Sequence, residues 1–109
     1  MRRYSVSFEG ANPRHEHEWN VWEDVKLPDD KVIVPGVIDS TTNFIEHPDL
    51  VAQRIVRYAE LVGRENVIAS VDCGFGTNAA STNVDHRIVW AKLEALSQGA
   101  AIASKKLWS

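Results

Sequence analysis

Four side chains that could do chemistry each stand where an apolar run of the sequence ends: Glu9, Asp39, Asp72 and Cys73. Apolar, β-branched runs predict strands, and the continuous run that begins at Val67 predicts a strand buried on both faces, as in a parallel sheet. Parallel strands bring their carboxyl ends to one edge, where α/β barrels place their active sites. We therefore expect these carboxylates and the thiol to gather at one edge of a parallel sheet.

The elements that must hold these side chains alternate between strand and helix along the chain. Alternating or continuous apolar residues predict strands, whereas apolar residues at steps of three and four predict helices. The connections are short, and the crossovers are long enough for right-handed parallel pairing. We expect strands over 4–8, over 32–38 and from 67, and a helix over 15–25 with Trp19, Trp22 and Val25 inward. A second helix is expected over 48–62, with an inward stripe of Val51, Ile55, Tyr58 and Val62. A final helix is expected after a cap at Asp85, with a stripe of Val89, Leu93, Leu96, Ala100, Ala103 and Leu107.

The composition of the chain limits the classes of protein and partner to be expected. The 109 residues carry a formal charge of -3 and an ordinary share of apolar residues, which predicts one globular domain over residues 1–109. Lysines and arginines form no cluster in the sequence, so nucleic acid and anionic membranes are not expected as partners. No apolar run approaches the roughly 18 residues of a spanning helix, and the single cysteine fits a reducing compartment. We expect a cytoplasmic protein.

Three segments of the sequence together resemble one enzyme family. The segments are Phe8-Glu9, Val34-Pro35-Gly36-Val37-Ile38-Asp39 and Asp72-Cys73-Gly74-Phe75-Gly76-Thr77. In this order and at these separations they resemble the C-terminal end of the catalytic barrel of cobalamin-independent methionine synthases, and most closely their short single-barrel relatives, which include epoxyalkane:coenzyme M transferase. The resemblance implies an α/β fold made of the last three strand-helix units of a TIM (β/α)₈ barrel, incomplete as an isolated chain because a whole barrel needs about 250 residues.

The resemblance implies a zinc ion that binds the thiol of a homocysteine-like substrate. A metal-bound thiol loses its proton and becomes the nucleophile that attacks a methyl or alkyl donor. In this sequence Glu9 matches the carboxylate ligand of the family and Cys73 its last thiolate ligand. The other two family ligands, a His and a Cys one residue apart on an earlier strand, have no counterpart here. Catalytic zinc usually has three protein ligands, so we expect this chain alone to bind zinc poorly.

The segment after the second strand departs from the methionine synthase pattern. Those enzymes have a proton-donating histidine two residues after the strand-end aspartate, whereas Asp39 is followed here by Ser40 and Thr41. Thr41 cannot protonate a leaving nitrogen near neutral pH, and His47 could do so only if the loop folds back. Asp39 and His47 are therefore the candidate catalytic residues of this sequence, and Asp39, Thr41 and Asp72 are the candidate substrate contacts. The missing histidine favours the alkyltransferase relatives over a methyltetrahydrofolate donor.

Each of these residues also has a purely structural interpretation. Cys73 could be a small buried hydrophobe, Glu9 a surface carboxylate, and the two aspartates loop caps. His15 and His17 flank a glutamate and invite a metal site, but neighbours two apart on a helix point in different directions. A solvated or phosphate-facing helix start is the favoured interpretation of that segment.

Three functional hypotheses follow. The first is a zinc-dependent thiol methyl- or alkyltransferase of the methionine synthase type, or the C-terminal part of one, acting on a thiol and an alkyl donor. The second is a non-catalytic, truncated remnant or interaction subunit. The third is a split enzyme whose barrel is completed by another chain or by self-association.

Overall fold

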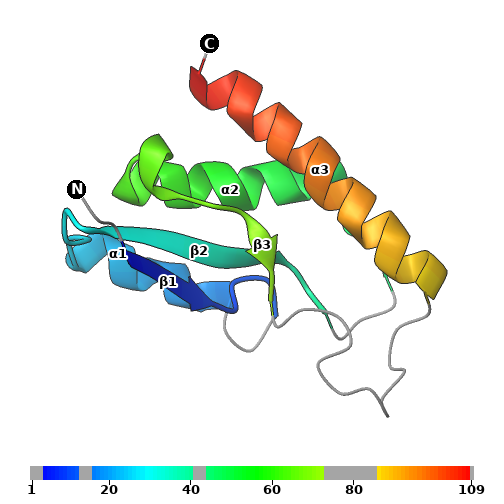
Figure 1. The fold of residues 1–109 in the computed structure, drawn as a ribbon, viewed down its shortest axis with the longest axis horizontal. Helices are drawn as coiled ribbons and strands as arrows, with labels where there is room; N and C mark the ends of the chain where they lie inside the picture. Colours follow the sequence, from blue (N-terminus) through cyan, green and yellow to red (C-terminus); the bar gives the residue numbers. More distant parts are fainter. Residues whose placement is uncertain (1–3, 13–15, 41–43, 73–85, 109) are drawn as a thin grey trace.

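A computed structural model describes residues 4–12, 16–40, 44–72 and 86–108 as three strands with helices beside them (Figure 1). The alternation of strand and helix expected from the sequence is confirmed. The elements are β1 (Tyr4–Phe8), η1 (Glu16–Asn20), α1 (Val21–Asp24), β2 (Lys31–Ile38), α2 (Pro48–Val62), η2 (Arg64–Asn66), β3 (Ser70–Val71) and α3 (His86–Trp108).

The strands form one parallel sheet in the order β1-β2-β3. β1 pairs with β2 along its whole length, from Tyr4 opposite Lys31 to Phe8 opposite Pro35. Against β3 the register of β2 shifts between Gly36 and Ile38, which marks a bulge. This sheet confirms the predicted parallel pairing and brings the carboxyl ends of the described strands to one edge.

α2 is the helix that the sequence specifies most completely. Pro48 occupies the first turn, where its missing N–H costs nothing, and Gly63 ends the helix at φ 101°, a backbone conformation that favours glycine. Three of the four residues of its predicted stripe, Val51, Ile55 and Tyr58, are buried. The expected helix and its inward face are therefore confirmed.

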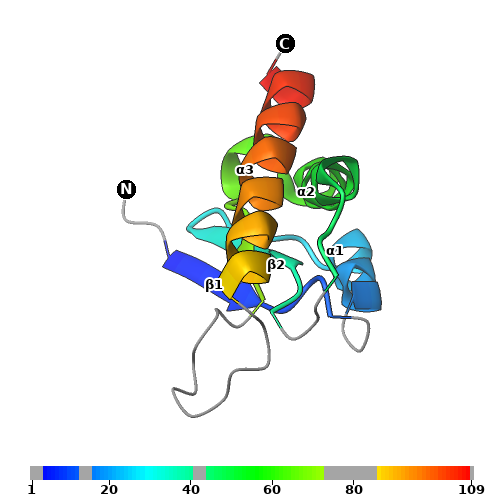
Figure 2. The ribbon, with the colours of Figure 1, turned by 90° about the vertical axis from the view of Figure 1, so that its right-hand side faces the viewer.

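α3 crosses α2 at close range, and Figure 2 shows α2 nearly end-on beside it. A Cβ atom added to Gly99 would lie 2.5 Å from the Cβ of Val51, so only a residue without a side chain fits at this crossing. The two helices and β2 enclose a core that contains Val37, Ile38, Val51, Ala52, Ile55, Ala95 and Ala103.

The buried face of α3 differs from the predicted one. Its buried residues are Lys92, Ala95, Gly99 and Ala103, whereas the larger residues of the predicted stripe, such as Leu93, are half-buried beside them. The reason is the short distance to α2, because a close helix crossing selects small side chains at its centre. Only Ala103 belongs to both sets.

Two further expectations on burial are corrected. Trp19 and Trp22 pack as expected against a cluster of Leu27, Ile33 and Tyr58, but Val25 is 52% exposed because the helix has ended before it. The run from Val67 forms only a two-residue strand within the described part, and Ile68 is 56% exposed rather than buried. β1 is also exposed along most of its length.

Candidate functional site

Asp72 ties together the carboxyl ends of the three strands. Its Oδ1 accepts hydrogen bonds from the backbone N–H groups of Gly10 (3.1 Å) and Ala11 (3.0 Å), which follow β1. Its own N–H donates to the carbonyl oxygen of Ile38 at the end of β2 (2.9 Å). The carboxylate therefore reaches from β3 across β2 to β1, which shows that the strand ends meet at one place.

Two glycines leave room for this carboxylate. A Cβ atom on Gly36 would lie 2.1 Å from Asp72 Oδ1 and 2.6 Å from Asp72 Cα. A Cβ atom on Gly10 would lie 2.6 Å from the carbonyl oxygen of Gly36 and 2.9 Å from the hydroxyl oxygen of Tyr58. Both glycines are required by close approach, since a side chain at either position would displace the atoms that form the site.

The surroundings of Asp72 favour its protonated form. Burial raises the pKa of Asp72 above its ordinary value of 3.8, the amides of Ala11 and Gly10 lower it, and the nearby charge of Asp39 raises it. The backbone amide of Asn12 also lowers this pKa, but the net direction is upward because burial is the largest cause. Its second oxygen, Oδ2, is buried and accepts no hydrogen bond from the described residues. Tyr58 below the site is also desolvated, and burial raises its pKa to about 12.

Asp39 is 1% exposed, and its backbone is held by the buried pair of Glu46 and Lys92. Its backbone N–H donates to Oε2 of Glu46 (2.8 Å), and the other oxygen, Oε1, lies 2.9 Å from Nζ of Lys92 on α3. The side chains of Glu46 and Lys92 are both fully buried, and Lys92 Nζ lies 4.8 Å from the ring centroid of Phe44. Reasoning from the sequence missed this ion pair. One feature of the sequence could have indicated it: Lys92 begins a series with Ala95, Gly99 and Ala103 at steps of three, four and four, which places it on one face of the helix with these small residues.

Arg54 is another buried cation that the sequence did not reveal. It lies on α2, is 7% exposed, and donates from Nη1 to the carbonyl oxygen of Val37 (3.1 Å). Its Nη2 lies 3.5 Å from Oε2 of Glu16. Arg54 thus connects η1 to the end of β2, and Glu16 is its ion-pair partner. Residues 16–40, 44–72 and the other described segments contain no group of three His, Cys, Asp or Glu side chains that could hold a metal ion.

The remaining site residues predicted from the sequence lie in three kinds of place. Glu9 follows β1 directly, is half-buried, and precedes the glycine that donates to Asp72. Cys73, which follows Asp72 in the sequence, and Thr41 lie outside the described residues. His47 caps α2: its side chain is 74% exposed, and its Nδ1 accepts a hydrogen bond from the N–H of Asp49 (3.0 Å). The roles proposed for these residues stay predictions.

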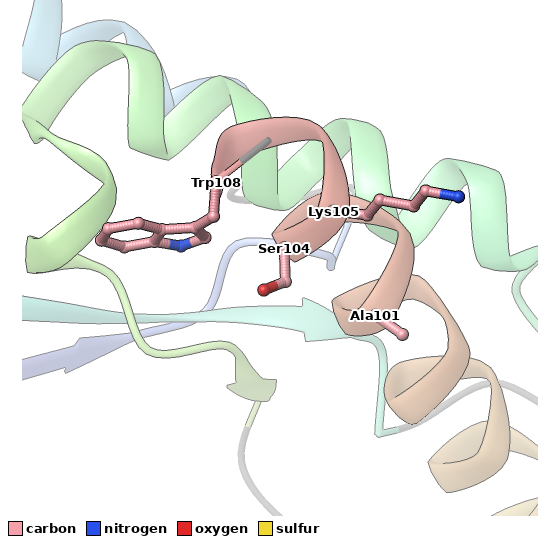
Figure 3. Close-up of a pocket in the computed structure, with 4 residues that line it drawn as sticks. All are labelled: Ala101, Ser104, Lys105 and Trp108. Carbon is pink, nitrogen blue, oxygen red and sulfur yellow. The ribbon is translucent and has the colours of Figure 1, made fainter.

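One open pocket lies away from this edge. It has a volume of about 530 Å³ and is lined by Ala101, Ser104, Lys105 and Trp108 on the last turns of α3 (Figure 3). Arg64, which precedes β3, stacks on the Trp108 ring with its guanidinium carbon 3.9 Å from the centroid. The pocket therefore belongs to the end of the fold where the strands begin, and none of the polar contacts around Asp72 reaches it.

The fold and the strand-end site define a mixed α/β protein with a parallel sheet. Among solved structures, the chain is similar to a B12-independent methionine synthase from Shewanella sp. W3-18-1, whose structure was determined in complex with selenomethionine. The TM-score is 0.74 at 27% sequence identity, and the match covers 95% of this chain. The chain spans 27% of the length of that synthase. No family model and no curated protein matches the sequence.

None of the helices in the described part of the chain is long and apolar enough to cross a bilayer.

Proposed function

We propose that this chain belongs to the B12-independent methionine synthase family and forms the last three strand-helix units of a TIM barrel. In this proposal the barrel is a cytoplasmic thiol methyl- or alkyltransferase. The observation that carries it is the junction at Asp72, because the family-like segments after β1, β2 and β3 meet there. The structural similarity over 95% of the chain supports the same assignment.

The proposed metal is zinc, with Glu9 and Cys73 as ligands. Glu9 directly precedes Gly10 in the sequence and Cys73 directly follows Asp72, and Gly10 and Asp72 are joined by a hydrogen bond of 3.1 Å. A carboxylate and a thiolate suit zinc in kind, but two ligands are fewer than the three of a usual catalytic site. The rest of the ligand set would come from outside these residues. When bound, zinc would supply the charge that keeps a substrate thiol deprotonated.

The aspartates of this chain would hold the substrate. Asp39 and Asp72 are close enough for the charge of one to raise the pKa of the other, and both stand at the carboxyl ends of strands. Such a pair would accept hydrogen bonds from a donor group of the thiol substrate or share a proton with it. Thr41 is proposed as a further contact. A role of His47 in proton transfer would require its imidazole to leave the cap of α2.

A barrel of this kind also needs a partner for β1. β1 stands at the edge of the described sheet and pairs there with β2 alone, so its other edge is available for a further barrel strand. Tyr4 (50%) and Val6 (39%) on this strand are exposed. We propose that these strands come from further polypeptide, from a second protein or from a second copy of this chain. They would bring the missing His and Cys ligands.

Cobalt spectroscopy tests the metal site with a readout for each ligand. Co²⁺ substitutes for zinc, and a thiolate ligand adds a charge-transfer absorption. We expect weak binding to the wild type, loss of this absorption in Cys73→Ser, and affinity reduced at least about tenfold in Glu9→Gln. Glu23→Gln, at an exposed position of α1, is the matched control and should bind as the wild type does.

Two results would count against the proposal. Cobalt affinity and absorption that neither Cys73→Ser nor Glu9→Gln changes would remove the site. Metal binding without alkylation of a thiol, even after the complementary barrel strands are added, would favour the non-catalytic interaction subunit.

A further inference from the structure

Glu46 and Lys92 form a buried ion pair whose cost needs an explanation. Both side chains have no exposed surface, although they come from the loop before α2 and from α3. Removing two charges from water costs free energy that their attraction often fails to return, and apolar residues of similar size frequently stabilise a fold as well or better. Stability alone is therefore a poor explanation for an ion pair at this position.

The geometry of Glu46 offers a better explanation. One carboxylate oxygen, Oε1, lies 2.9 Å from Lys92 Nζ, and the other accepts the N–H of Asp39 at 2.8 Å. The ion pair at Oε1 limits rotation of the Glu46 carboxylate, so its other oxygen, Oε2, stays in place. The hydrogen bond to Oε2 then fixes the amide of Asp39, the residue that directly follows β2.

The contacts next to Asp39 make its position matter. The carbonyl oxygen of Ile38, the residue before Asp39, accepts the N–H of Asp72 (2.9 Å), and the Oδ1 of Asp72 is fixed by the amides of Gly10 and Ala11. One of the two aspartates is therefore fixed from β1, and the other from α3 through Glu46. Moving the backbone of Asp39 would change the distance between the two acids without changing any side chain that touches a ligand.

We propose that Glu46 and Lys92 are positioning residues, which hold Asp39 beside Asp72 through its backbone amide. The inference rests on the proposed function, because only there does Asp39 contact a substrate. It assigns α3 a role in the site through Lys92. Lys92 acts on Glu46, and Glu46 acts on Asp39.

Two double variants separate positioning from charge pairing. Glu46→Gln with Lys92→Met removes both charges but keeps an oxygen that can accept from the Asp39 amide. Glu46→Met with Lys92→Met has nearly the same shape and no acceptor. Hydrogen exchange of the Asp39 amide, measured by NMR, should stay near the wild-type rate in the first and rise at least about tenfold in the second. Thermal unfolding identifies any variant that fails to fold.

The second measurement is thiol transfer by the assembled enzyme. We expect the KM for the thiol to rise about tenfold in the Met/Met variant and to stay near wild type in the Gln/Met variant, with kcat little changed in both. If the wild type transfers and the two variants behave alike in exchange and KM, positioning is overturned. If exchange differs between them but no form of the protein alkylates a thiol, Glu46 does fix Asp39, and the proposed function is what fails.

Discussion

The two ends of α3 place lysines in opposite surroundings. Lys92, near the start, is fully buried against Glu46 beside the strand-end site, whereas Lys105, near the end, is exposed and lines the open pocket with Trp108. The ammonium of Lys92 is removed from water and lies 2.9 Å from Oε1 of Glu46, whereas Lys105 is exposed to water. A buried ion pair therefore fixes the half of α3 next to the strand-end site, whereas the other half is held only by contacts that water can screen.

The largest expected effect comes from removing the buried lysine. Lys92→Met leaves the Glu46 carboxylate buried without its cation, which should lower the free energy of unfolding by about 3–5 kcal/mol. Lys105→Met is the matched control on the same helix and should change it by less than about 0.5 kcal/mol. Urea denaturation followed by circular dichroism measures both. Equal effects would show that the two ends of α3 do not differ as described.

The second largest effect on stability is expected from a side chain at Gly36, which would meet Asp72. Gly36→Ala places a methyl group against the Asp72 carboxylate and backbone, and overpacking of this kind costs about 1–3 kcal/mol. Asp72→Ala in the same chain removes the carboxylate but leaves the backbone of residue 72 in the way, so it should relieve only part of the cost. A double-mutant cycle in urea measures the coupling. Full additivity of the two substitutions would contradict the close approach.

The stability of the chain should also depend on pH through Asp72. Because the folded-state pKa of Asp72 is raised above 3.8, the folded chain binds this proton more tightly than the unfolded chain. The contribution of Asp72 to stability is fully present below pH 3.8 and is lost as the pH rises through the folded-state pKa. The stability of the wild type relative to Asp72→Asn should therefore fall as the pH rises from 3.8 through the folded-state pKa. Urea midpoints of both proteins over a series of pH values provide the test. A wild type that becomes more stable relative to Asp72→Asn as the pH rises would contradict the prediction.

The smallest effect is expected at the far end of α3. Trp108 is 56% exposed, and its stacking on Arg64 should contribute about 0.5–1 kcal/mol. Trp108→Ala should lower the urea midpoint slightly, and Trp108→Phe, which keeps an aromatic face, should recover part of the loss. A loss as large as that of Lys92→Met would remove the distinction between the two ends.

Much of the fold could be predicted because local patterns agree with it. Strand β1 and helix α2 have the residues expected, since alternation, the proline start and the glycine end are local signals. The face of α3 could not be predicted in the same way. Its burial depends on how closely α2 approaches, and that distance depends on Gly99 and Val51, which are far apart in the sequence.

The candidate site shows the same division. Strand-end acids at Asp39 and Asp72 could be predicted from where apolar runs stop, and the structure brings both to one edge. Glu46, Lys92 and Arg54 could not, because a charged residue in a sequence is assigned to the surface unless a buried partner is known. Their partners lie 46 residues away for Lys92 and 38 for Arg54.

The shifted register between Gly36 and Ile38 has a consequence for protein engineering. In a regular strand, one residue more or fewer turns every later side chain to the opposite face, and Asp39 would leave the interior. A bulge already accommodates one residue out of step, so it is the place where β2 can absorb a change in length. A deletion at Val37 should therefore be repaired by straightening the strand, whereas the same deletion at Val32 should reverse the faces of the residues up to the bulge.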